Sequence, residues 1–459
     1  MKTMKFGGSS VKDAERIKNV VTIVKESAEK EQVAVVLSAM KGITDALINC
    51  ANLAASGDES YKPALQEIKD KELNTFKELI GTEKEQEALK SLEKMLTNLG
   101  EILLGIKMVK ECSDRSLDLI QSFGERMNNT VVAAYMRSIG IDAEYVDTRE
   151  VVLTDNSFGA AKVDYKESYK RIKEKINTIK GIPVITGFIG ADPDGVTTTL
   201  GRNGSDFTAS IIAAATGSSI VEIWTDVDGV LSADPRCVKN AFVIPEITYQ
   251  EAMELSFFGA EVIHPYTMIP AVDRDIPIII KNTMNPSAPG TIITREVAPH
   301  TRPITGIASI KDIAMINIMG GGMIGTPGIA SKVFSALADY GINIIMISQA
   351  SSEHSICLVF RAIQSERAVE ALNNILAEEI KTKRIEKIVV REGLEVLSVI
   401  GDNMVGTPGV AGKIFKSLGD EGISVLSIAQ GSSERNVSFV IDKEHRDKAL
   451  NIVHDAFLI

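Results

Sequence analysis

Short apolar runs alternate with longer segments of mixed polarity along the first two thirds of the chain. Four of these runs are typical of buried strands: Val33–Leu37, Val184–Phe188, Ile220–Trp224 and Ile276–Ile280. Continuous apolar runs of this length indicate strands that are covered on both faces, as in parallel sheets between helices. The pattern therefore predicts an α/β layer fold with a mainly parallel sheet.

A different pattern covers Tyr61–Asp118, where Lys, Glu and Leu recur at helical spacing and no proline follows Pro63. Such spacing places apolar residues on one side of each helix and charges on the other. The segment is predicted to form a helical subdomain whose charged faces are solvated.

The last third of the chain contains an internal repeat. The segment Met323–His354 aligns without a gap with Met404–Arg435, at an offset of 81 residues. Each copy has a Gly-Pro turn, a helix, and a strand that ends in glutamine, at Gln349 or Gln430. Repeats of this kind are sought before any fold is assigned, since they fix the unit of architecture.

Each copy begins with a predicted strand, Ala314–Met319 or Val396–Ile400, and closes with a third strand and a second helix. This is a split βαβ pattern. The second copy lacks a final strand before the chain ends, and the apolar segment Ile304–Ile310 is a candidate for it. The first unit would then be inserted in the second.

Composition narrows the function classes. The chain has 459 residues and a net charge of −11, which does not favour binding to nucleic acid or membranes. Its four cysteines are scattered without a CxxC pair, which predicts reduced thiols in the cytoplasm and no zinc site. No signal peptide or apolar stretch of about 18 residues is present, so we expect no transmembrane helix.

A candidate phosphate site lies at the start of the chain. Lys5 stands at the end of a predicted strand, followed by Gly7, Gly8, Ser9 and a helix from Ala14. Glycines allow close approach of the backbone to an anion, and a helix N-terminus offers free N–H groups. The residues alone are equally compatible with a plain strand–turn–helix and a surface lysine.

This opening, KFGGSSV, resembles the signature of the aspartate kinases in the amino-acid kinase family, and the repeat resembles tandem ACT domains, which bind amino acids at their interfaces. Further motifs that resemble this family follow in its order: Leu37–Thr44, Phe123–Arg126, Gly187–Ala209, Trp224–Arg236, Phe258–Pro265 and Asn285–Thr291.

The resemblance implies an amino-acid-kinase-like α/β/α sandwich with a mainly parallel sheet and two ACT domains of the ferredoxin-like βαββαβ type. The expected catalytic domain spans residues 1–295. The first ACT domain is expected at 311–392, and the second at 296–310 together with 393–459.

The resemblance also implies the reaction: transfer of the ATP γ-phosphoryl group to the side-chain carboxylate of L-aspartate, the first step towards lysine, threonine and methionine. Lys5 would stabilise the transferring group and Asp206 would orient Lys5. From the sequence alone, Asp206 is typical of the N-cap of the apolar helix that follows. Mg²⁺ is expected to bind with ATP, without a metal site of the protein.

Aspartate carries one ammonium and two carboxylates, so its site needs charges of both signs. Arg202 suits the α-carboxylate and Glu125 the ammonium. The resemblance assigns the substrate to Thr44, Glu125 and Arg202, with Ser205 as a further hydroxyl donor. Without it, a salt-bridged glutamate and a loop arginine are the simpler interpretation.

Nucleotide contacts are expected from Gly7, Gly8 and Ser9 and, by resemblance, from a later set. Two of that set depart from the family: one relative has tyrosine at the position of Leu231 and lysine at that of Glu261, so a ribose contact and a second catalytic cation are in question. The full later set is Thr225, Asp226, Leu231, Arg236 and Glu261.

Lysine or threonine is the expected effector, lysine being preferred, in a homodimer or homotetramer formed through the ACT domains. The alternatives are another amino-acid kinase, acting on glutamate, acetylglutamate or UMP, and a non-catalytic amino-acid sensor, which only Glu261 favours. The residues predicted to bind the effector are Met323, Gly325, Thr326, Gly328, Ile329, Asn343, Ile344, Gln349 and Gln430.

Overall fold

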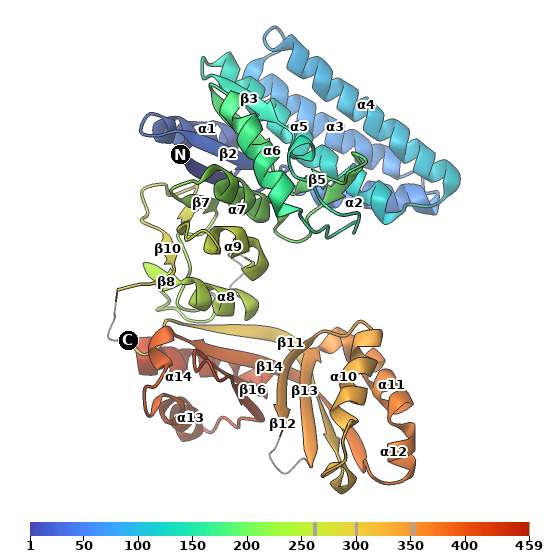
Figure 1. The fold of residues 1–459 in the computed structure, drawn as a ribbon, viewed down its shortest axis with the longest axis vertical. Coiled ribbons are helices and arrows are strands. Elements are labelled where there is room, and N and C mark those ends of the chain that lie inside the picture. The colour runs from blue at the N-terminus through green and yellow to red at the C-terminus, as the bar shows by residue number, and fades with distance from the viewer. Residues whose placement is uncertain (260–263, 299–301, 350–353, 459) are drawn as a thin grey trace. The chain divides into compact units, whose positions relative to one another are not determined.

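The computed structural model describes residues 1–259, 264–298, 302–349 and 354–458 (Figure 1). The chain forms two compact units. The first contains Met1–Val230, Val243–Tyr249 and Val262–Val297, and the second contains Leu231–Phe242, Gln250–Glu261 and Ala298–Ile459. In the described part of the chain, no helix is both long and apolar enough to cross a membrane.

The first unit is built on an eight-stranded sheet in the order β3-β4-β2-β1-β7-β9-β10-β8. The strands from β3 to β9 in this order are parallel, β10 is antiparallel to β9, and β8 is parallel to β10. The strands are β1 (Lys2–Phe6), β2 (Val33–Leu37), β3 (Ala143–Val146), β4 (Ile182–Thr186), β7 (Val221–Thr225), β8 (Glu246–Thr248), β9 (Ile278–Asn282) and β10 (Thr291–Thr294).

All four predicted strands are present, and Val33–Leu37 has the predicted bounds. The predicted strand Val184–Phe188 instead ends at Thr186, because Phe188 has a φ of 70° and leaves the extended conformation. The other two strands lie one or two residues further along the chain than predicted.

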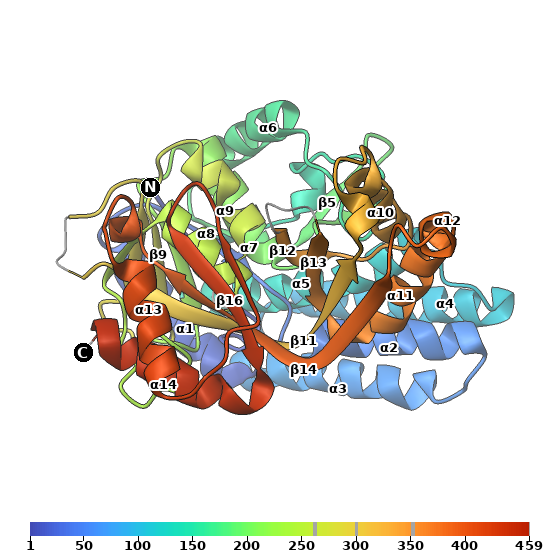
Figure 2. The same ribbon diagram turned by 90° about the horizontal axis from the view of Figure 1, so that it is seen from below.

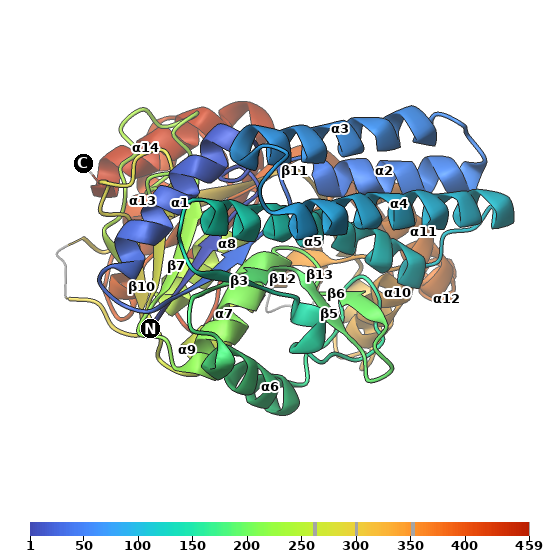
Figure 3. The same cartoon turned by 90° about the horizontal axis from the view of Figure 1, so that it is seen from above.

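Helices cover both faces of this sheet (Figure 3). On one face lie α1 (Ala14–Ala28) and α5 (Asp114–Ser138), and on the other α7 (Gly204–Thr216) packs with α6 (Tyr165–Thr178) and α9 (Pro265–Val272). The predicted α/β/α sandwich with a mainly parallel sheet is confirmed. A two-stranded hairpin, β5 (Ile189–Ala191) with β6 (Thr197–Thr199), follows β4.

The predicted helical subdomain is confirmed as well. It contains α2 (Ile43–Ser56), α3 (Tyr61–Ile80), α4 (Gln86–Val109) and the beginning of α5, which lie side by side (Figure 1). Leucines and other apolar residues at helical spacing form one buried cluster with the sheet, so this bundle shares the core of the first unit.

The second unit contains a six-stranded antiparallel sheet in the order β12-β13-β11-β14-β16-β15. Its strands are β11 (Gly306–Met319), β12 (Ile344–Gln349), β13 (Ser355–Arg361), β14 (Lys387–Ile400), β15 (Ser427–Gln430) and β16 (Asn436–Asp442). Its helices are α10 (Ile329–Asp339), α11 (Ser365–Ile375), α12 (Ala377–Lys381), α13 (Val410–Asp420) and α14 (Arg446–Leu458), preceded by part of α8 (Tyr249–Phe257).

The two central strands are longer than the repeat predicts. Ala314–Met319 and Val396–Ile400 are the ends of two 14-residue strands, β11 and β14, which pair with each other along both repeats (Figure 2). Gly306–Ile310 pairs with Val396–Ile400 of the second copy. This pairing supports our proposal that residues 296–310 and 393–459 form one ACT domain and that 311–392, inserted between them, form the other.

Candidate active site

Four loops of the first unit meet at one edge of its parallel sheet. Phe6, the last residue of β1, is in register with Leu37 of β2 and Trp224 of β7, and Leu37 is in register with Thr186 of β4. The segments that follow these strands therefore leave the sheet together. In open α/β sheets this carboxyl edge is where ligands bind.

Lys5 and Asp206 form a buried ion pair at this edge. The Lys5 Nζ lies 2.5 Å from Asp206 Oδ1, and the two side chains are only 11% and 6% exposed. The sequence suggested that Asp206 is the N-cap of its helix, which is wrong. α7 begins at Gly204 with Asn203 as N-cap, and Asp206 lies in the first turn. The earlier start follows from Asn203, which adopts the left-handed conformation at a φ of 54° and redirects the chain.

The Gly7-Gly8 turn packs against both Lys5 and the loop after β2. A Cβ atom on Gly7 would lie 3.5 Å from Lys5 Nζ, and one on Gly8 would lie 2.9 Å from the Ala39 carbonyl oxygen. The Lys41 N–H donates to the Gly8 carbonyl at 3.1 Å. Any side chain at Gly8 would push the two loops apart, which explains the glycine at this position.

Glu125 reaches the same loop from α5. Its Oε1 accepts a hydrogen bond from the Ala39 N–H at 3.2 Å, while Oε2 is buried without a hydrogen-bond partner among the described residues. Burial raises the pKa of Glu125 to about 8. A buried carboxylate with one unsatisfied oxygen is suited to bind a cation.

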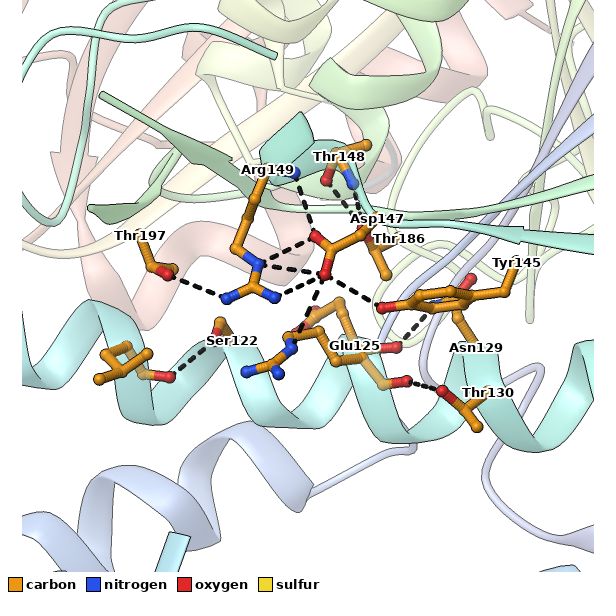
Figure 4. A network of polar contacts seen from close by, with 12 residues as sticks. Ser122, Glu125, Asn129, Thr130, Tyr145, Asp147, Thr148, Arg149, Thr186 and Thr197 are labelled. Carbon is orange, nitrogen blue, oxygen red and sulfur yellow. Dashed lines mark hydrogen bonds and ion pairs between the residues drawn. The ribbon is translucent and has the colours of Figure 1, made fainter. Parts of the chain in front are cut away.

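The sequence analysis missed the residues of α5 that hold this arrangement. The Asn128 side chain donates to the Ser38 carbonyl at 2.6 Å. The Asn129 side chain donates to the carbonyl of Leu37 and to that of Glu125, the latter drawn in Figure 4. Asp118 accepts from the N–H and hydroxyl of Thr199 at the end of β6. Asp118 and Asn129 lie about three turns apart on one face of α5, a spacing that a periodic analysis of its polar residues would have found.

Ser205 directly precedes Asp206 in the sequence and packs against the backbone that follows β4. A Cβ atom on Gly187 would lie 2.6 Å from Ser205 Cβ, and the next N–H, of Phe188, donates to the Thr208 hydroxyl at 3.0 Å. Arg202 lies in the exposed turn before α7. Ser205 and Arg202 are thus on the segment that also carries Asp206, but only Ser205 is buried.

Substituting Gly187 with alanine tests this close packing. The added methyl group cannot fit against Ser205 without moving α7, so we expect kcat/KM to fall at least roughly tenfold and the free energy of unfolding to fall by about 1–3 kcal/mol. The control is Gly105→Ala in α4, where an added Cβ meets no atom within 4 Å. Equal activities of the two variants would contradict this account.

The remaining predicted residues of the first unit lie at the same edge. Thr44 is the second residue of α2, half-buried in the first turn after the Gly42 N-cap. Ser9 is half-buried in the turn between β1 and α1. Thr225 ends β7, and its hydroxyl donates to Asp226 Oδ1 at 3.2 Å.

The other predicted nucleotide residues are not part of the first unit. Leu231 and Arg236 belong to the second compact unit, where Arg236 is exposed and its Nε lies 2.9 Å from Asp234 Oδ1. Glu261 lies outside the described residues. Among the described residues, no group of three or more His, Cys, Asp or Glu side chains is placed to hold a metal ion.

The predicted effector residues lie on the turn before α10 and on β12. Gly325 and Gly328 have φ values of 64° and 95°, Gly328 is the N-cap of α10, which begins at Ile329, and Gln349 and Asn343 are exposed. The rest of the predicted set lies on the same elements: Met323 ends the short 3-10 helix before that turn, Thr326 is within the turn, and Ile344 begins β12.

A cavity of about 300 Å³ lies at the matching place in the second copy, where Gln430 lines it. The Gly406 N–H there already donates to Glu434 Oε2 at 2.7 Å. Six predicted residues of the first copy have their repeat counterparts in its lining, namely Met404, Gly406, Thr407, Gly409, Val410 and Gln430. Of these six residues, Gln430 is in the predicted effector set.

Comparisons with known proteins agree with this architecture. The amino acid kinase family model matches residues 2–282, and an ACT domain model matches 316–376 and 397–457. Aspartokinase 2, chloroplastic, of Arabidopsis thaliana is 34% identical over 99% of this chain and 84% of its own length. Bifunctional aspartokinase/homoserine dehydrogenase 1, chloroplastic, of the same plant is 39% identical over 99% of this chain. The chain spans about half the length of such bifunctional relatives.

Solved structures are similar over the whole chain. Clostridium acetobutylicum aspartate kinase matches with a TM-score of 0.84 and 31% identity, and E. coli aspartokinase III in complex with aspartate and ADP matches with 0.82 and 28%. Each match covers 100% of both chains. The resemblance inferred from the ordered motifs and the repeat is thereby confirmed, and the chain belongs to the amino acid kinase family and, within it, to the aspartokinases with tandem ACT domains.

Proposed function

We propose that the chain transfers the γ-phosphoryl group of ATP to the side-chain carboxylate of L-aspartate, giving 4-phospho-L-aspartate, as the first step towards lysine, threonine and methionine. The observation that carries this proposal is the buried Lys5–Asp206 pair beside Gly7, at the sheet edge that Glu125 also reaches through Ala39. The similar E. coli aspartokinase III was solved with aspartate and ADP, which supports the same substrates here.

The chemistry requires little more than positioning and charge neutralisation. The nucleophile is a carboxylate, which is already ionised at pH 7, so the reaction needs no general base. Lys5 stabilises the negative charge on the transferring phosphoryl group. Asp206 fixes the Lys5 ammonium by their 2.5 Å contact and is therefore a positioning residue.

The substrate ammonium pairs with Glu125, whose free Oε2 is buried at the site. Arg202 binds the α-carboxylate by two parallel hydrogen bonds, a task for which its exposed turn leaves the guanidinium accessible. Thr44 and Ser205 donate hydroxyl hydrogen bonds. These four roles follow from charge and from the resemblance to aspartate kinases.

ATP binds with its phosphates at Gly7, Gly8 and Ser9, where backbone N–H groups precede α1. Thr225 and Asp226 are proposed to contact the adenosine end of ATP and Arg236 a phosphate. Leu231 and Glu261 are proposed as further residues of the nucleotide site. Mg²⁺ would be held mainly by phosphate oxygens and water.

We propose regulation by lysine, threonine or both through the ACT domains, in a homodimer or homotetramer. E. coli aspartokinase III, which matches this chain with a TM-score of 0.80 and 28% identity, was also solved with lysine and aspartate in its T-state. Allostery of this kind requires an effector that binds one of two states more tightly. The cytoplasm is the proposed compartment, since the cysteines are free thiols: Cys50, Cys112, Cys237 and Cys357.

The effector site can be assigned to a repeat by matched glutamine variants. Gln349→Ala and Gln430→Ala each remove a side-chain amide that could bind the effector. Loss of that hydrogen bond should raise the inhibitor concentration for half inhibition about 5–10-fold. Uninhibited activity should not change. The two variants are compared in the same assay with lysine, threonine and both, and unchanged inhibition in both would exclude the glutamines as effector ligands.

The assay that tests the function is ATP-dependent formation of an acyl phosphate from L-aspartate, trapped as the hydroxamate. Activity with aspartate and not with glutamate supports the proposal. Activity with glutamate, acetylglutamate or UMP instead would indicate another amino-acid kinase. A folded protein that binds lysine or threonine and phosphorylates none of these acceptors would be a non-catalytic sensor.

A further inference from the structure

A cavity of the first unit shares no residue with the proposed active site. Its volume is about 460 Å³, within the range of small-molecule pockets. It lies between α4, α5 and the end of β3, and the polar residues that matter for its chemistry are Ser91, Lys94, Asn98, Arg126, Tyr145 and Asp147.

Asp147, the acidic residue of this lining, already has its partners. It is 7% exposed and accepts hydrogen bonds from Arg149 Nε at 2.9 Å and from the second Arg149 nitrogen at 2.7 Å (Figure 4). The Tyr145 hydroxyl donates to the same carboxylate at 3.2 Å. Arg149 therefore pairs with Asp147 through two parallel hydrogen bonds.

Arg126 is a second guanidinium beside the same carboxylate. Its Nε approaches Asp147 Oδ2 only to 3.8 Å, its side chain is 16% exposed, and its guanidinium lies 4.7 Å from the centroid of the Phe123 ring. Burial and then the neighbouring Arg149 lower the pKa of Arg126. Two guanidiniums share one carboxylate, so this end of the cavity carries one excess positive charge.

The opposite wall adds a cation and neutral donors. Lys94 on α4 is exposed, and no acidic side chain of the described residues lies within 4.0 Å of its ammonium. Asn98 lies one turn further along α4, and Ser91 lies one turn before. The third basic residue of the lining, Arg137, is neutralised by Glu85 at 2.7 Å.

From this arrangement we propose that the cavity binds the phosphate group of a small phosphate monoester. Arg126 and Lys94 together match the charge of a phosphate dianion, and guanidinium and amide donors suit its oxygens. The cavity is much larger than a phosphate ion, so the organic part of the ester fits within it, beside the apolar wall of Ala88 and Met95.

Two structural connections link this cavity to the aspartate site, whose assignment rests on the proposed function. Arg126 follows Glu125 on α5, and the third nitrogen of Arg149 donates to the Thr197 hydroxyl of β6 at 3.2 Å, shortly before the turn that carries Arg202. The bound ester would thus regulate the KM for aspartate, and the sign of the effect is read from the kinetics.

Isothermal titration of the full chain tests the binding, with glycerol 3-phosphate and inorganic phosphate as probes. The titrations use a Lys5→Ala background, which removes the proposed catalytic phosphate contact. We expect one saturable site that Arg126→Gln weakens at least tenfold and Lys94→Gln several-fold. Lys90→Gln, one helical turn before Lys94 and not in the lining, should leave affinity unchanged.

Failure of both probes to saturate the chain would overturn the proposal. Unchanged affinity in an Arg126→Gln variant whose thermal unfolding matches the parent would overturn it as well. Tighter binding of the ester than of inorganic phosphate assigns a phosphorylated metabolite. Equal binding supports the phosphate site and assigns the free ion. Binding without aspartate phosphorylation by the wild-type chain would reject the proposed function and leave this site standing.

Discussion

Replacing Lys5 with alanine is expected to lower kcat for aspartate phosphorylation by roughly 10³-fold, the usual cost of removing a preorganised charge from a transition state. The Lys5 ammonium is buried, fixed 2.5 Å from Asp206 and adjacent to Gly7, so water cannot replace it in the same position. Lys5→Arg should also remain poor, because the larger planar group does not fit beside Gly7.

The control for Lys5→Ala is Lys2→Ala on the same strand. Lys2 pairs with Glu222 at 2.9 Å, at the amino end of β1, away from the carboxyl edge. Lys2 also lies 3.4 Å from Glu31, so each variant removes a lysine that is ion-paired in the folded chain, and only the first should lose activity. Hydroxamate formation measures the rate and circular dichroism the fold. A folded Lys5→Ala variant with normal turnover would remove Lys5 from the mechanism.

The KM for aspartate is expected to fall about tenfold per pH unit as pH rises from 6 towards 8. Burial raises the pKa of Glu125 to about 8, so its neutral form predominates at pH 6. Pairing with the substrate ammonium requires the carboxylate, and binding must therefore release a proton below this pKa. In Glu125→Gln the KM should be roughly 10²-fold higher at pH 8 and independent of pH.

Glu72 provides the matched control for this titration. It is fully buried in α3, and burial raises its pKa to about 8 as well, but it is not among the predicted site residues. Both carboxyls have raised pKa values in the folded chain, so the stability they contribute is present at low pH and is lost as pH rises through 8. Glu72→Gln should relieve that loss and leave the slope of KM unchanged. A wild-type KM that does not vary with pH would contradict the proposed role of Glu125.

The parts of the site that are local in sequence were predictable. Lys5, Gly7 and Gly8 follow one strand and precede one helix, and their chemistry depends on that order alone. The pairing of Lys5 with Asp206, 201 residues later, came from the resemblance to aspartate kinases, because no periodicity relates a strand to a helix that is distant in the chain.

Other features depend on packing that sequence patterns do not contain. The contact of Glu125 with Ala39 requires the rotation of α5 about its axis, and the start of α7 at Gly204 depends on the left-handed Asn203. Arg236 was grouped with Thr225 by the resemblance to aspartate kinases. Its segment instead belongs to the second unit, where Ser232 Oγ lies 3.0 Å from His454 Nε2, 222 residues further along the chain.

The long strands shared by the two ACT repeats also affect the order in which the chain can be made and folded. Gly306–Ile310 pairs with Val396–Ile400, so about 90 residues must leave the ribosome before that strand finds its partner. At about 5–20 residues per second this takes roughly 5–20 s. During this interval an apolar strand edge is open, and a nascent chain at this stage is a substrate for a chaperone or for another unfinished copy.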